Sequence, residues 1–193
     1  MLSIVVLISG SGSNLRALLE ACDNPMFPAK VLGVGADNPA SGIAHAEEFD
    51  VTTFVVENKY FANRDAWASR LAEHIDILQP DLIVLAGFMK ILPASFVERY
   101  RGKLINMHPS LLPQFPGAHA VRDALAAGAT KTGSTIHLVD EGVDTGRILV
   151  QREIEIPQGI SEHELHERIK EVEREQLVRL VYEIAANEIT LED

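Results

Sequence analysis

Asn106 and His108, one residue apart, are the side chains of this sequence best placed to do chemistry. They follow the apolar pair Leu104-Ile105, which predicts a short buried strand. Side chains at positions i and i+2 of an extended backbone point to the same side, so the amide and the imidazole would face one spot. Both groups can donate hydrogen bonds to a developing oxyanion. Taken alone, such a pair is more often a turn-capping asparagine and a buried structural histidine.

A Gly/Ser-rich loop near the start of the chain is a second candidate site. Residues 9–14 read Ser-Gly-Ser-Gly-Ser-Asn and lie between the apolar run Ile4–Ile8 and a helical pattern that begins at Leu15. Such a loop offers backbone N–H groups, hydroxyls and the positive end of a helix dipole to an anion. It lacks the Lys-Ser/Thr pair of a P-loop, and Leu15 stands where a dinucleotide fingerprint needs its third glycine. A terminal phosphate monoester is therefore favoured, with an unliganded turn as the alternative.

The hydrophobic pattern predicts the elements that must position these groups. Strands alternate with helices, which indicates an α/β fold: a mostly parallel, twisted, Rossmann-like sheet with helices on both faces. We also expect an antiparallel edge strand near the C-terminus, a long C-terminal helix, and a single domain over residues 1–193. Ligands of such sheets bind beyond the carboxyl ends of the strands. The expected strands are Ile4–Ile8, Val31–Val34, Thr53–Val56, Leu82–Ala86, the run beginning at Leu104, Ser134–Val139 and the half-exposed edge strand Ile148–Ile156. The expected helices begin at Leu15, Ile43, Arg64, Ala120 and the capping box of Ser161 and Glu164.

Composition and charge narrow the class of partner. Of the 193 residues, 47% are hydrophobic and 23% charged, which is typical of soluble globular proteins. The formal charge of −11 argues against a partner such as nucleic acid. No apolar run reaches the roughly 20 residues of a membrane helix, and the single cysteine, Cys22, indicates a reducing compartment. We therefore expect a cytoplasmic protein with small-molecule substrates, no nucleic acid and no membrane partner; a homodimer stays open.

Four motifs occur in a fixed order along the chain. They are Ser-Gly-Ser-Gly-Ser-Asn-Leu at 9–15, Leu-Ala-Gly-Phe-Met-Lys-Ile-Leu at 85–92, the segment 106–117 that opens with Asn-Met-His-Pro-Ser-Leu-Leu-Pro, and Gly-Val-Asp-Thr-Gly at 142–146. Together they resemble the phosphoribosylglycinamide formyltransferases, folate-dependent formyltransferases of de novo purine synthesis. The resemblance covers nearly the whole chain, and Asn-x-His-Pro-Ser-Leu-Leu-Pro is a specific motif.

The resemblance implies a reaction and a set of site residues. The reaction is transfer of the formyl group of 10-formyltetrahydrofolate, as co-substrate, to the amine of phosphoribosylglycinamide, with no metal. Asn106 and His108 would stabilise the tetrahedral oxyanion, and Asp144 would tune His108 and assist proton transfer. The implied phosphoribosylglycinamide-binding residues are Gly12, Ser13, Asn14, Lys170 and Glu173. The implied folate-binding residues are Arg64, Met89, Lys90, Ile91, Leu92 and Asn106.

Two positions depart from the pattern of the family. Arg147 stands where a proline usually follows Asp-Thr-Gly, and Arg174 stands where a histidine usually follows the glutamate. Neither change removes a catalytic group. Both bear on local shape, the first on the loop that carries Asp144 and the second on the contact made by Glu173.

Other functions compete with this one. A formyltetrahydrofolate deformylase would use the same three side chains for hydrolysis, but usually has an additional N-terminal domain. A methionyl-tRNA formyltransferase usually has an additional C-terminal RNA-binding domain, and this chain is acidic. A metal hydrolase on His108, His119 and His137 lacks a recognised ligand spacing, and His137 is expected to be structural. A non-enzymatic nucleotide-binding module would explain the Gly-rich loop but not Asn106, His108 and Asp144.

Overall fold

The computed structural model describes residues 1–191, and the predicted domain boundary at residue 193 lies outside the described residues. Each expected strand and helix is present, with small shifts at its ends. The strands are β1 (Leu2–Ile8), β2 (Ala29–Ala36), β3 (Thr52–Val55), β4 (Leu82–Leu85), β5 (Leu104–His108), β6 (Lys131–Leu138) and β7 (Ile148–Glu155). The helices are α1 (Ser13–Cys22), α2 (Ile43–Glu48), α3 (Arg64–Leu78), α4 (Ala94–Arg99), α5 (Ala120–Ala126) and α6 (Glu162–Ala185), with a 3-10 turn, η1 (Asn58–Tyr60). The short α4 and η1 were not expected.

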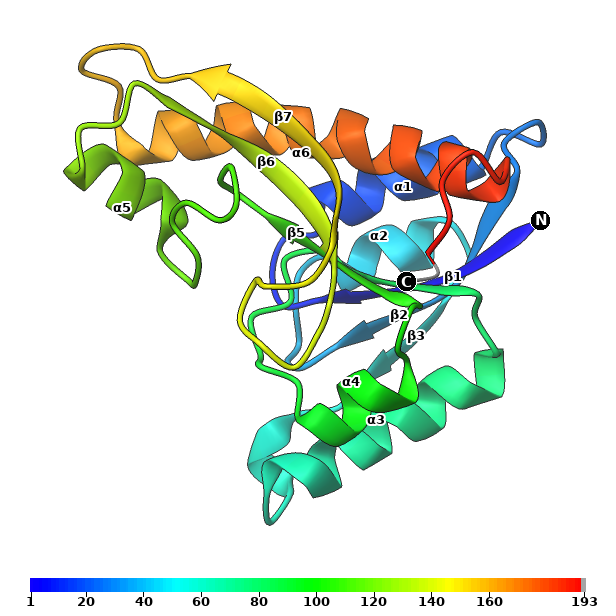
Figure 1. Ribbon diagram of the computed structural model, residues 1–193. Helices are drawn as coiled ribbons and strands as arrows, with labels where there is room; N and C mark the ends of the chain where they lie inside the picture. The colour runs from blue at the N-terminus through cyan, green and yellow to red at the C-terminus, as the bar shows by residue number, and fades with distance from the viewer. Residues whose placement is uncertain (192–193) are drawn as a thin grey trace.

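The strands form one mixed sheet in the order β3-β2-β1-β4-β5-β6-β7 (Figure 1). Neighbours from β3 to β5 pair in parallel, whereas β6 pairs antiparallel with β5 and β7 antiparallel with β6. The predicted Rossmann-like class is thereby confirmed, with two antiparallel strands at the C-terminal edge instead of the single one expected. This order places the ends of β1, β4 and β5 next to one another.

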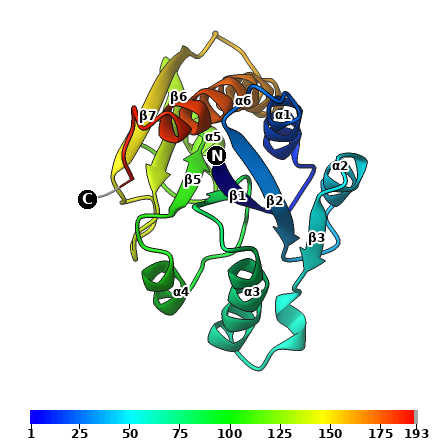
Figure 2. The same cartoon turned by 90° about the vertical axis from the view of Figure 1, so that its right-hand side faces the viewer.

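Helices cover both faces of the sheet, as Figure 2 shows. Alternate residues of β1 explain why its apolar run is continuous: Ile4, Val6 and Ile8 pack in one core cluster with residues of α1 and α6. Val5 and Leu7 point to the other face and pack in a second cluster with residues of α3 and α4. From Ile4 to Ile8 every side chain of β1 is fully buried. After this run, polar residues begin at Ser9, directly after the strand ends.

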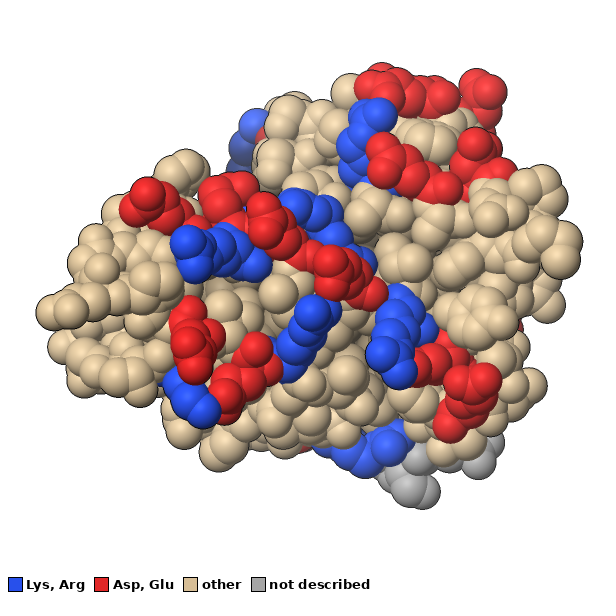
Figure 3. All heavy atoms as spheres, turned by 90° about the horizontal axis from the view of Figure 1, so that it is seen from above, with Lys and Arg blue, Asp and Glu red and all other residues tan. Residues whose placement is uncertain are grey.

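The long helix α6 has a buried stripe and a charged outer face. Its N-terminus has the predicted capping box, in which Ser161 and Glu164 each accept from the backbone N–H of the other. Leu165, Ile169 and Leu177 are fully buried beneath the helix. Basic and acidic side chains mingle on the outer side, seen from above in Figure 3. Among the described residues, no helix combines the length and the apolar character that crossing a membrane requires.

Candidate active site

Asn106 and His108 lie at the C-terminal end of β5, and their side chains point to the same side of the strand. The antiparallel pairing of β6 with β5 places His137 directly opposite Asn106. The Asn106 amide nitrogen lies 3.3 Å from His137 Nε2. His108 is 4% exposed and His137 only 2%. A second histidine, from a different strand, therefore lies beside Asn106.

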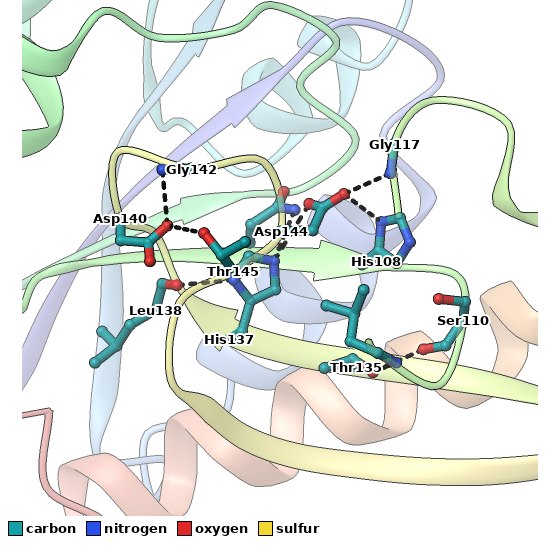
Figure 4. Close-up of polar contacts among 12 residues, drawn as sticks. His108, Ser110, Gly117, Thr135, His137, Leu138, Asp140, Gly142, Asp144 and Thr145 are labelled. Carbon is teal, nitrogen blue, oxygen red and sulfur yellow. Dashed lines mark hydrogen bonds and ion pairs between the residues drawn. The ribbon is translucent and has the colours of Figure 1, made fainter. Parts of the chain in front are cut away.

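Asp144 lies between the two histidines, as Figure 4 shows. Its Oδ2 accepts the backbone N–H of Gly117 at 2.8 Å and lies 3.3 Å from His108 Nδ1. Its Oδ1 lies 3.5 Å from His137 Nε2. The contact with His137, the N–H of Gly117 and the charge of His108 lower the pKa of Asp144 to about 2, against the opposing effect of burial. Asp144 is thus a carboxylate at neutral pH.

The two groups that face the ring nitrogens of His108 are both hydrogen-bond acceptors. Its Nε2 lies 2.8 Å from the carbonyl oxygen of Phe115, and its Nδ1 faces Asp144. A carbonyl oxygen and a carboxylate only accept hydrogen bonds, so both contacts are satisfied together only when each ring nitrogen bears a proton. The arrangement can therefore hold an imidazolium, which is a stronger donor to an oxyanion than a neutral ring.

His137 was expected to be structural, and the structure gives it contacts inside the site. Its Nδ1 lies 2.8 Å from the carbonyl oxygen of Leu138 and therefore bears a proton. Its Nε2 lies 3.3 Å from the Asn106 amide nitrogen and 3.5 Å from the Asp144 carboxylate. No local signal distinguishes this histidine, because its position depends on the pairing of β5 with β6. The sequence pattern showed only that His137 lies on the face of its strand opposite Ile136 and Leu138.

Only one of the three carboxylates on the turn after β6 reaches the histidines. Asp140 Oδ1 accepts the N–H of Gly142 at 3.0 Å and the hydroxyl of Thr145 at 2.7 Å, which closes the turn on itself (Figure 4). Glu141 is exposed and lies 3.8 Å from Arg101. The Arg147 guanidinium donates to the carbonyl oxygen of Thr190 at 3.0 Å. Arg147 therefore leaves the contacts of Asp144 with the histidines in place.

The Gly/Ser-rich loop ends at the N-terminus of α1. Gly12 caps the helix in the left-handed region, with φ of 70°, and no side chain closes the helix end. Asn14 donates to the buried carboxyl of Glu173 at 3.0 Å, while its Oδ1 has no hydrogen-bond partner among the described residues. Burial raises the pKa of Glu173. The loop, Asn14 and Glu173 are thus brought together as expected, whereas Lys170 is paired with Glu167 at 2.8 Å.

Arg174 does not displace Glu173 from Asn14. It instead faces an open cavity of about 370 Å³ beside the loop. The cavity is lined by Ser11, Ser13, Arg16, Ala17, Glu20, His45 and Arg174. Its lining combines Ser11, Ser13 and Arg174 with Arg16, whose charge is already paired with Glu20 and Glu48.

The loop after β4 touches the Gly/Ser-rich loop. The N–H of Ser9 donates to the carbonyl oxygen of Gly87 at 3.2 Å, and the N–H of Met89 donates to the Ser9 hydroxyl at 2.8 Å. Met89 and Ile91 are 73% and 63% exposed, which is unusual for such side chains and suits an apolar ligand. Leu92, by contrast, is buried in the core beneath this loop.

Within residues 1–191, no hydrogen bond or ion pair joins either cationic residue implied for the folate to Asn106, His108 or Asp144. Lys90 lies 3.9 Å from the carboxylate of Asp37. Arg64 begins α3 and is exposed, and within residues 1–191 no hydrogen bond or ion pair joins it to the loop after β4. Nor do the described residues include a group of three or more His, Cys, Asp or Glu side chains arranged to hold a metal ion.

These features define a Rossmann-like α/β protein with a candidate active site at the carboxyl edge of its sheet. The formyl transferase family model matches residues 2–181. The chain is 45% identical over 188 residues to phosphoribosylglycinamide formyltransferase of Mycobacterium tuberculosis, covering 97% of this chain and 87% of that protein. The chain belongs to the formyl transferase family, and the resemblance found from its motifs is confirmed.

Solved structures of related proteins have the same fold. The crystal structure of glycinamide ribonucleotide transformylase 1 from Symbiobacterium toebii has a TM-score of 0.95 and 34% identity, covering 100% of this chain and 91% of that one. Phosphoribosylglycinamide formyltransferase from Brucella melitensis has a TM-score of 0.90 and 39% identity, covering 96% of each chain. The shared architecture extends over the strands and helices that position the site described above.

Proposed function

We propose that this protein transfers the formyl group of 10-formyltetrahydrofolate to the amine of phosphoribosylglycinamide. The observation that carries the proposal is the carboxylate of Asp144, which lies between His108 and His137 at the side of Asn106. Family membership supports formyl transfer, and the names of the relatives support this acceptor. The arrangement suits a reaction in which an oxyanion forms and a proton must move.

The amine attacks the formyl carbon and converts its carbonyl oxygen into an oxyanion. Asn106 has two amide hydrogens, so one can remain on His137 while the other meets the oxyanion. The Nε2–H of His108, which here donates to the Phe115 carbonyl oxygen, would turn to the oxyanion as the second donor. The Asp144 carboxylate faces His108 Nδ1 on the other side of the ring.

Collapse of the intermediate requires one proton to change nitrogen. The attacking amine loses a proton, the folate nitrogen gains one, and the bond between the formyl carbon and that nitrogen breaks. A water molecule hydrogen-bonded to the Asp144 carboxylate would relay the proton from one nitrogen to the other. No covalent nucleophile is needed, and burial raises the pKa of the lone cysteine, Cys22, to about 11.

The remaining predicted residues would hold the two substrates. The backbone N–H groups of Gly12, Ser13 and Asn14, together with the Ser13 hydroxyl, would bind the phosphate. Glu173 would bind the ribose hydroxyls, and Lys170 would leave its ion pair for the phosphate. For the folate we propose Arg64, Lys90 and Leu92, together with the exposed apolar surface of Met89 and Ile91 and the amide of Asn106. We further propose that both substrates are met in the cytoplasm. A homodimer stays a prediction that light scattering would test.

The experiment that tests the proposal follows folate release by absorbance. The purified protein is mixed with 10-formyltetrahydrofolate, with and without phosphoribosylglycinamide. We expect release only when the amine substrate is present. Equal release in water alone would contradict transfer and identify a deformylase, and no release under either condition would contradict both activities.

A second measurement tests the phosphate site. The dephosphorylated ribosylglycinamide should bind far more weakly, because each lost charge-assisted hydrogen bond costs roughly 1.5–3 kcal/mol. Ser13→Ala should raise the KM for the phosphorylated substrate more than it lowers kcat. Its effect on the dephosphorylated substrate should be small. Equal affinity of the wild-type protein for the two substrates would show that the loop is a plain turn.

A further inference from the structure

The Gly/Ser-rich loop is hydrogen-bonded to α2 and to the turn that precedes α2. Figure 2 shows α2 beside α1. The N–H of Gly42 donates to the carbonyl oxygen of Gly10 at 3.0 Å. His45, on α2, has its Nε2 3.1 Å from the carbonyl oxygen of Ser11. Two successive carbonyl groups of the loop are therefore bonded to the same neighbouring segment.

Arg16 determines which nitrogen of His45 bears the proton. Its Nη1 lies 3.1 Å from His45 Nδ1, and a guanidinium only donates hydrogen bonds. His45 Nδ1 must therefore offer its lone pair, which leaves the ring proton on Nε2, where it donates to Ser11. Arg16 is itself held by Glu20 and Glu48, each at 2.9 Å. Every contact in this chain of hydrogen bonds thus has a matched donor and acceptor.

Holding a carbonyl group fixes the direction of the next N–H group. In a trans peptide the C=O and the following N–H point in opposite directions. Because the Ser11 carbonyl group points to His45, the N–H of Gly12 points away from α2. The Gly10 carbonyl group accepts from Gly42, so the N–H of Ser11 likewise points away from that segment. The approach is close: a side chain on Gly42 would put its Cβ 2.9 Å from the Gly10 carbonyl oxygen.

We propose that His45 is a positioning residue for the phosphate of the substrate. Held as its Nε2–H tautomer by Arg16, it fixes the carbonyl group of Ser11 and thereby the direction of the Gly12 N–H. This N–H, with the N–H of Ser11 that Gly42 orients and the uncapped start of α1, would face one anion. His45 also lines the cavity beside the loop. Both of its ring nitrogens are engaged, by Ser11 and by Arg16, so we infer that it acts through the loop. The inference rests on the proposed function, in which this loop binds the phosphate of phosphoribosylglycinamide.

Two substitutions at this position test the proposal. His45→Leu removes both the donor and the acceptor, whereas His45→Gln keeps one of each on a single amide. His45→Leu should raise the KM for phosphoribosylglycinamide about three- to tenfold, as expected for one lost hydrogen bond, with kcat changed less than about twofold. For dephosphorylated ribosylglycinamide the variant should behave like the wild type. His45→Gln should recover most of the loss, and the matched control His163→Leu, at an exposed position of α6, should change neither constant.

The phosphate dependence separates positioning from a merely structural role. A general weakening of the fold by His45→Leu would raise the KM for both substrates alike, lower the melting temperature and overturn the proposal; an unchanged KM would also overturn it. Nitrogen NMR of labelled protein at neutral pH gives an independent readout, and an Nδ1–H or doubly protonated ring would contradict the assigned tautomer. If the wild-type protein does not distinguish the two substrates, the proposed phosphate site fails; if it does and His45→Leu changes nothing, only the role of His45 fails.

Discussion

Replacing Asp144 by asparagine removes one negative charge from between His108 and His137 and keeps the shape of the side chain. Asparagine suits this position for a second reason: the backbone of Asp144 is left-handed, with φ of 55°, a conformation that asparagine adopts more readily than most residues. Substitution by alanine would mix backbone strain with the loss of charge. The asparagine variant therefore reports on the carboxylate itself.

The expected loss of activity follows from the contacts of the carboxylate. Without the charge of Asp144, His108 has only a neutral amide beside its Nδ1, so the cationic donor to the oxyanion is weakened. Losing one such donor lowers kcat by roughly 10²–10³, and losing help in proton transfer by roughly 10²–10⁴. We expect kcat of Asp144→Asn to fall by about two to four orders of magnitude, with the KM values changed far less.

The same variant should change how stability depends on pH. The pKa of Asp144 is lowered in the folded protein from 3.8 to about 2, so the folded state prefers the carboxylate. Such a group stabilises the fold above pH 3.8, and its contribution is lost as the pH falls toward 2. The shift corresponds to at most about 2 kcal/mol, or roughly 4–8 °C in Tm. Calorimetry at pH 7 should show a lower Tm for Asp144→Asn, and the difference from the wild type should narrow as the pH falls.

Asp140→Asn is the matched control, because it neutralises a carboxylate on the same turn. Asp140 contacts Gly142 and Thr145 but no histidine, so kcat should stay within about tenfold of the wild type. The reasoning would be refuted if Asp144→Asn kept near-normal turnover while Asp140→Asn abolished it. It would also be refuted if the two variants lost activity equally, since the effect would then come from the shape of the turn.

Two further predictions concern the substrate sites. Because burial raises the pKa of Glu173, ionisation of this side chain lowers the stability of the fold as the pH rises above 4.5. Glu173→Gln should therefore have a higher Tm than the wild type at pH 7 and yet raise the KM for phosphoribosylglycinamide. A lower Tm at that pH would contradict this account. Ile91→Asp changes an exposed side chain, so the Tm should stay that of the wild type. The KM for 10-formyltetrahydrofolate should rise about tenfold, the size expected when one apolar side chain is no longer buried against the ligand. An equal rise in the KM for the other substrate would contradict a folate role for Ile91.

Local pattern was enough to predict the fold and part of the site. Alternating strands and helices, with an unbroken apolar run from Ile4 to Ile8, indicated a parallel sheet covered on both faces, because a doubly buried strand favours such a run. The shared side of Asn106 and His108 followed from the two-residue period of an extended backbone. The capping box at Ser161 predicted where α6 begins, since its two hydrogen bonds join residues only three positions apart. Each of these properties depends on near neighbours in the chain.

Tertiary structure alone decided which other groups share the site. His137 reaches Asn106 because β6 pairs antiparallel with β5 in one register, and a shift of one residue would turn it to the opposite face. Asp144, and not Asp140 or Glu141, meets the histidines because the turn after β6 closes on Asp140. These contacts join residues from separate strands and loops, and their relative positions depend on how the whole sheet is assembled. Periodicity within a segment therefore contains no signal for them.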